Sequence, residues 1–90
     1  MTDSQLDRFA SASANHAMTA AAEYIRQHGL AVSDYEAACV VLRREVKAVL
    51  NEALDYAKAA MEAGMGAMAE ATFIASMRLA GIAAAKEFAK

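Results

Sequence analysis

Hydrophobic and polar residues follow a helical period along most of this chain, and two glycine-containing interruptions divide the pattern. The first interruption lies at Gly29 and the second at Gly64-Met65-Gly66. Because the period is helical and the chain has no proline, the pattern predicts three α-helices at about residues 3–28, 33–63 and 67–89. We expect an all-α fold, a small helical bundle of one domain that spans residues 1–90.

The segment 3–28 carries a narrow stripe made mostly of small side chains. The stripe consists of Leu6, Ala10, Ser13, Ala17, Ala20 and Tyr24. Side chains this small favour the close approach of another helix, because the distance between packed helices depends on the side chains at the contact. Thr2 and Gln5 form a weak capping box at the start, and Gly29 is the expected left-handed stop at the end.

The segment 33–63 shows a clean division between an apolar and a charged side. Ser33-Asp34-Tyr35-Glu36 fits the S/T-x-x-E capping box, which places the helix start at Ser33. Cys39 lies on the apolar side, where a free cysteine is expected to behave as a small hydrophobic residue. Val40 and Val41 interrupt the division, and we expect them to lie under a neighbouring helix. The apolar side consists of Cys39, Leu42, Val46, Val49, Leu50, Ala53, Tyr56, Ala57, Ala60 and Met61.

The stretch from Gly64 to Ala85 has no polar side and contains only the charges of Glu70 and Arg78. A helix that is apolar all round must be buried on every side, which a chain of 90 residues can hardly provide alone. The stretch therefore predicts a partner, most simply a second copy of the chain. A turn at Gly64–Gly66 is the preferred interpretation, and one continuous helix of roughly 80 Å from Ser33 to Ala89 is the alternative.

The third segment has two apolar sides, of which one can complete the chain's own bundle and the other can face a second molecule. Glu70 and Arg78 are expected to pair across an interface, because unpaired buried charges are costly. The candidate residues for self-association or partner binding are Met68, Phe73, Met77, Leu79, Ile82 and Phe88. Met61, Met65 and Met68 surround the glycine turn, either as core filling or as an adaptable contact surface.

Composition strengthens the prediction of a homodimer. Hydrophobic residues make up 58% of the chain, but alanine dominates them, and there are only six Met, three Phe, three Tyr and no Trp. The core available to a monomer is therefore thin, and oligomerisation is a usual remedy. The single cysteine and the start MTDSQLDRF, which lacks the features of a signal peptide, indicate a cytoplasmic protein.

No catalytic, cofactor-binding or metal-binding pattern is evident, and we do not expect an enzyme. His16 and His28 lie on different sides of the first helix and cannot bind one ion from that helix alone. A membrane-active helix at residues 64–85 is one alternative, since its length suffices for a span. Against it stand the two internal charges and the lack of flanking basic clusters.

DNA binding is the other alternative, because two helices joined by a short glycine-containing turn have the arrangement of a helix-turn-helix. Arg43, Arg44 and Lys47 would supply its phosphate contacts. The acidic residues Asp34 and Glu36 at the start of that helix, and a net charge of −2, oppose binding to nucleic acid. The favoured function is a non-enzymatic protein-interaction module that self-associates through the third helix and binds or inhibits a larger partner, as an adaptor or a phage-type inhibitor.

Overall fold

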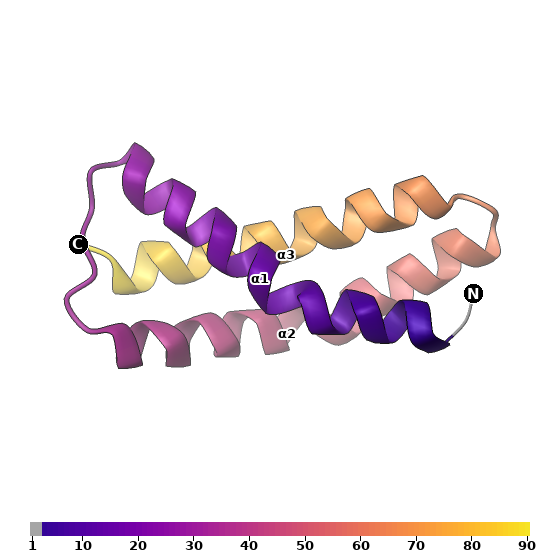
Figure 1. Ribbon diagram of the computed structural model, residues 1–90, viewed down its shortest axis with the longest axis horizontal. Helices are drawn as coiled ribbons and strands as arrows, with labels where there is room; N and C mark the ends of the chain where they lie inside the picture. The colour runs from indigo at the N-terminus through magenta and orange to yellow at the C-terminus, as the bar shows by residue number, and fades with distance from the viewer. Residues whose placement is uncertain (1–2) are drawn as a thin grey trace.

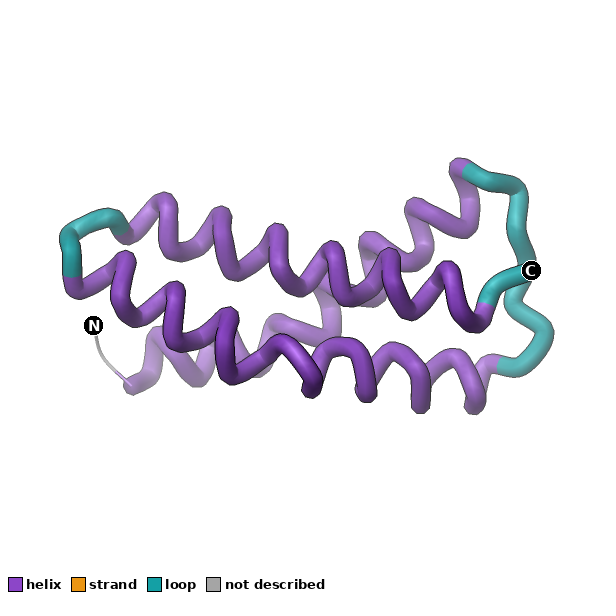
Figure 2. The backbone as a smooth tube through the Cα atoms, turned by 180° about the vertical axis from the view of Figure 1, so that it is seen from behind, coloured by secondary structure: helices purple, strands orange, loops and turns teal. Residues whose placement is uncertain are grey.

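The computed structural model describes residues 3–90 of the protein, with side-chain surroundings from Asp7 onward. It contains three helices, α1 (Asp3–Gln27), α2 (Tyr35–Glu62) and α3 (Gly66–Phe88), in a body of 43 × 22 × 16 Å. Helices α2 and α3 lie antiparallel as a hairpin, and α1 crosses one face of that hairpin (Figure 1; Figure 2). The predicted all-α bundle of three helices is confirmed.

Both predicted glycine stops end a helix. Gly29 has a φ of +63° and Gly64 a φ of +78°, a backbone region that glycine adopts readily. In each turn two backbone N–H groups donate to the last helical turn: Gly29 to Arg26 and Leu30 to Ile25 after α1, Gly64 to Met61 and Met65 to Ala60 after α2. This is the Schellman motif. The chain therefore turns at Gly64, and the alternative of one continuous helix is wrong.

The start of α2 lies one residue later than the capping box predicts. Asp34, not Ser33, is the N-cap, and its carboxylate accepts a hydrogen bond of 3.1 Å from the backbone N–H of Ala37. An ionised carboxylate is a stronger acceptor than a hydroxyl and also interacts favourably with the positive end of the helix. The capping residues Thr2 and Gln5 proposed for α1 lie outside the residues whose side chains are described.

Asp34→Ala is expected to lower the free energy of unfolding by about 1 kcal/mol, because the amide of Ala37 loses its acceptor. In a domain of this size such a loss lowers the melting temperature by about 4–8 °C, measured by circular dichroism. Ser33→Ala is the matched control and is expected to change stability by less than about 0.5 kcal/mol. An equal loss in both variants would mean that Ser33 shares the capping role.

The core consists of alanines around two large side chains. Phe73 and Met77 of α3 are fully buried, and the ring of Phe9 stacks on that of Phe73 with 5.3 Å between centroids. Val46 contributes from α2. The buried alanines are Ala17, Ala20, Ala21, Ala38, Ala53, Ala57, Ala69, Ala80, Ala84, Ala85 and Ala89. This composition agrees with the thin core expected from the sequence.

Helices α1 and α3 approach each other closely where they cross. A Cβ atom at Gly81 would overlap the carbonyl oxygen of Ala17 and lie 2.7 Å from its carbonyl carbon. Ser13, Ala17, Ala20 and Ala21 are buried along the same side of α1. The predicted role of the small-residue stripe, close helix–helix approach, is confirmed.

Helix α1 bends near its middle, so that its second half rises away from α2 (Figure 1). Around this point Ser13 Oγ donates to the carbonyl of Ala10 at 2.7 Å, and Thr19 Oγ1 donates to that of Asn15 at 2.8 Å. Hydroxyl groups that bond back to the preceding turn often bend helices. The bend carries α1 away from the start of α2.

Two expectations for the start of α2 are wrong. Cys39 is exposed rather than buried, and Val40 is 63% exposed rather than covered by a neighbouring helix. Cys39 lines the space that opens where α1 moves away from α2, whereas Val40 lies on a side of α2 that α1 does not contact. The chain's last residue instead contacts the α1–α2 loop, through paired backbone hydrogen bonds of 2.8 and 3.0 Å between Ala31 and Lys90.

Candidate interaction surface

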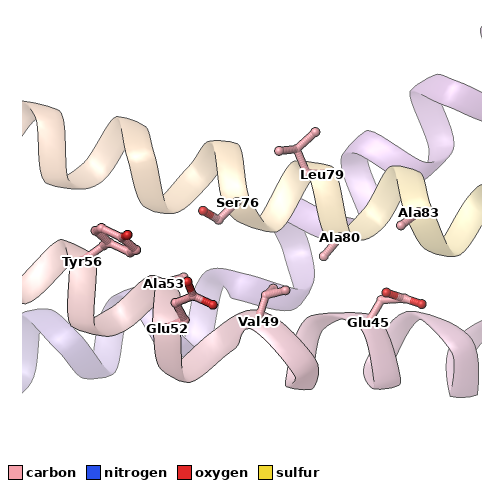
Figure 3. A pocket seen from close by; sticks show the side chains of 9 residues that line it. All are labelled: Glu45, Val49, Glu52, Ala53, Tyr56, Ser76, Leu79, Ala80 and Ala83. Atoms are coloured by element: carbon pink, nitrogen blue, oxygen red, sulfur yellow. The ribbon is translucent and has the colours of Figure 1, made fainter.

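The α2–α3 hairpin has two faces, and α1 covers only one of them. The other face, called here the open face, carries a groove of about 330 Å³ between the two helices (Figure 3). The floor of this groove is apolar, and two carboxylates stand on its α2 side. The lining residues are Glu45, Val49, Glu52, Ala53, Tyr56, Ser76, Leu79, Ala80 and Ala83.

An uncharged strip runs along α3 beside this groove. Leu79 is 67% exposed and Met68 56% exposed, while Ile82 is half-buried. The exposed alanines Ala71 and Ala75 fill the space between them along the helix. These five residues, Met68, Ala71, Ala75, Leu79 and Ile82, are called the α3 strip. In Figure 3 Leu79 points away from α2, toward solvent.

The structure divides the six predicted interface residues between the core and the surface. Phe73 and Met77 are buried in the chain's own bundle, and Phe88 is half-buried at the end of α3, away from Leu79. Phe73 and Met77 therefore form no surface, which leaves Met68, Leu79 and Ile82 as accessible interface candidates. The sequence left open which apolar side of α3 faces inward, and the core contacts of Phe73 decide it.

No known protein family, curated protein or solved structure matches the chain. The chemistry of the open face and of the α3 strip is therefore the basis for assigning a function.

The two charges inside α3 are placed differently from each other. Arg78 forms an ion pair with Glu23 of α1, so the interface that this pair crosses lies between two helices of the same chain. Both side chains are more than a third exposed, and such a pair contributes only about 0–1 kcal/mol. Glu70 is exposed at the edge of a groove that Arg8 and His16 also line, and it has no ion pair among the described residues.

The basic patch proposed for DNA contact is partly neutralised. Arg44 donates hydrogen bonds to Glu87 of α3 and to its neighbour Glu45. Both bonds raise the pKa of Arg44, and the bond to Glu87 has the larger effect. Arg43 and Lys47 are exposed on α2. Carboxylates therefore stand directly beside the middle member of the patch.

A second apolar surface was not predicted from the sequence. The bend of α1 opens a cleft of about 190 Å³ between α1 and α2, with exposed Met18, Tyr35 and Cys39 among its lining residues. Two of its lining residues, Cys39 and Leu42, belong to the apolar side that the sequence predicts for residues 33–63.

The apolar length of α3 and the placement of possible metal ligands bear on membrane crossing and metal binding. Helix α3 is long and apolar enough to cross a membrane. The core helix of a soluble protein meets the same condition, and a third of the most apolar stretch of α3 is buried in the bundle. Among the residues that the structure describes, no group of three His, Cys, Asp or Glu side chains is arranged to hold a metal ion.

Proposed function

We propose that this protein is a non-enzymatic interaction module of the cytoplasm that self-associates through the α3 strip. The observation that carries the proposal is the exposure of Leu79 and Met68 along an uncharged strip on a helix whose other side forms the core. Isolated exposed apolar residues are ordinary, but a continuous strip of them typically marks a contact surface. The exposed thiol of Cys39 suits a reducing compartment.

The thin core supports the same proposal. Phe73 and Met77 are the only large side chains that are fully buried among the described residues, and the rest of the core is mostly alanine. Alanine contributes little apolar area, since hydrophobic stabilisation scales with the area removed from water. Burying the α3 strip against a second copy adds apolar area that the single chain lacks.

We further propose that the module binds a larger protein, as an adaptor or an inhibitor. The α1–α2 cleft supports this, because its lining is almost wholly apolar and it lies apart from the α3 strip. Met18 at its edge is a flexible, polarisable side chain that adapts to different partner shapes. Self-association and partner binding would then use different surfaces.

Leu79→Asp is expected to convert the dimer to a monomer, because a carboxylate in the middle of the strip would have to lose its water on association. Size-exclusion chromatography with light scattering across the micromolar range gives the oligomeric state, and circular dichroism checks that helicity is retained. Val40→Asp is the matched control: Val40 is as exposed as Leu79 but lies at the start of α2.

The wild-type chain and Val40→Asp are expected to form dimers at the upper end of that range and to dissociate on dilution. A wild-type chain that is monomeric throughout that range, or a Leu79→Asp variant that dimerises as well as wild type, would contradict self-association through the strip.

A further inference from the structure

The α3 strip is complementary to itself when two copies of the helix lie antiparallel. We infer that two chains pack α3 against α3 in this orientation, with Ala75 on the two-fold axis. Residues equally distant from Ala75 then face each other: Leu79 meets Ala71 of the second copy, and Met68 meets Ile82. The inference rests on the proposed self-association and specifies its geometry.

The fit of side-chain sizes supports this arrangement. In a two-fold interface each contact occurs twice, so a large residue is best placed opposite a small one. Leu79, the most exposed large side chain of the strip, lies over Ala71, whose methyl group leaves room for it. At the axis Ala75 meets its own copy, and two alanines let the backbones approach closely. A parallel pair would instead place Leu79 on Leu79 and leave gaps at the alanines.

The charges beside the strip also favour the antiparallel orientation. Lys86 is exposed eleven residues after Ala75, and the α2–α3 turn at Gly64 lies eleven residues before it, next to exposed Glu62. The antiparallel dimer thus brings Lys86 to Glu62 of the second copy, twice by symmetry. Nζ of Lys86 is 6.0 Å from the ring centre of Tyr24, at the outer limit of a cation–π contact. Because this contact is weak, the Lys86 side chain is free to turn toward Glu62 of the second copy.

A parallel dimer would place Lys86 beside Lys86 and align the two helix dipoles in the same direction, and both effects oppose association. The charges also select the register of the antiparallel pair. Sliding one copy by a helical turn places Lys86 on Met68 in one direction and Arg78 on Met68 in the other. Either slide buries a cation against an apolar side chain, which is costly.

The size of the strip predicts a weak dimer. From Met68 to Ile82 the helix rises by about 21 Å. Stable interfaces usually bury about 800 Å² on each partner, and a contact along one helix of this length lies at the lower end. We therefore expect dissociation in the micromolar range, where the equilibrium can be followed directly.

Disulfide cross-linking tests the register. In a Cys39→Ala background, which removes the natural exposed thiol, single cysteines are placed at positions 71, 75 and 79 by Ala71→Cys, Ala75→Cys and Leu79→Cys. Only position 75 should meet its own copy within the distance that a disulfide spans. The proteins are oxidised under mild conditions, and covalent dimer is quantified on non-reducing gels. Asn51→Cys, at an exposed position of α2, reports random collisions.

Ala75→Cys is expected to cross-link at least about tenfold faster than Asn51→Cys, because the dimer holds its thiols at a high effective concentration. Ala71→Cys and Leu79→Cys should cross-link efficiently only when the two proteins are mixed. Efficient self-linking at all three positions would show a parallel dimer, and a dimer without linking at position 75 would show another register; each result overturns this inference and leaves self-association intact. A chain that stays monomeric by light scattering would overturn both proposals.

Discussion

Gly81→Ala is expected to destabilise the protein by about 2 kcal/mol or more, the cost of overpacking a tight core contact. The added methyl group would overlap the backbone of Ala17, which cannot rotate away as a side chain can. Helices α1 and α3 would have to separate at their crossing, and the neighbouring core contacts would loosen. In a domain of this size the loss corresponds to a fall of about 8 °C or more in melting temperature.

The sign of this effect separates tertiary packing from helix propensity. Alanine is favoured over glycine inside a helix by about 1 kcal/mol, so propensity alone would make Gly81→Ala stabilising. Gly66→Ala is the matched control, because a Cβ atom there meets nothing within 4 Å. Urea unfolding of both variants should show a loss at position 81 and little change or a gain at position 66. A stabilised Gly81→Ala variant would show that α1 does not cross α3 at this point.

Phe73→Ala is expected to lower the free energy of unfolding by about 3–5 kcal/mol, the usual cost of removing a buried aromatic ring. Phe73 is 1% exposed and is one of two large, fully buried side chains in the described part of the chain. Its removal also takes away the stacking partner of Phe9. Because the other fully buried residues are mostly alanine, the ring of Phe73 is a large share of the buried apolar area, and the variant is expected to be largely unfolded at 37 °C.

Leu79→Ala provides the comparison from the opposite side of the same helix. Leu79 is exposed in the single chain, so at concentrations below dimer formation its truncation should change stability by less than about 0.5 kcal/mol. Chemical denaturation followed by circular dichroism measures both variants. Similar losses for Phe73→Ala and Leu79→Ala under dilute conditions would mean that the two sides of α3 are not divided between core and surface as described.

The local structure of the protein could be predicted from its sequence to a large degree. The helical period and the absence of proline indicate three helices, and Gly29 and Gly64 end two of them with positive φ. These features depend on contacts within a few residues, so the sequence around them suffices. The displacement of the cap from Ser33 to Asp34 shows the limit, since neighbouring residues that can both cap differ only in acceptor strength.

The candidate surface could be predicted only in part. The sequence predicts Met68, Leu79 and Ile82 as interface residues, but it equally predicts Phe73 and Met77, which are buried. The apolar cleft beside Cys39 was missed, because it exists only where the bend in α1 withdraws a helix from α2. Arg78 was expected to pair across an interface, and its partner, Glu23, is distant in sequence and comes near only through the crossing of α1 over α3.

The sequence by itself determined the three helices, their glycine stops and the small-residue stripe that lets α1 approach another helix. Only the tertiary structure decided which apolar side of α3 faces inward, because both sides of that helix are apolar and local pattern does not distinguish them. The choice depends on where α1 crosses, which Ala17 and Gly81 fix through backbone contact between segments far apart in the chain. That crossing encloses Phe73 and leaves Leu79 exposed, and so creates the surface proposed to bind a second copy.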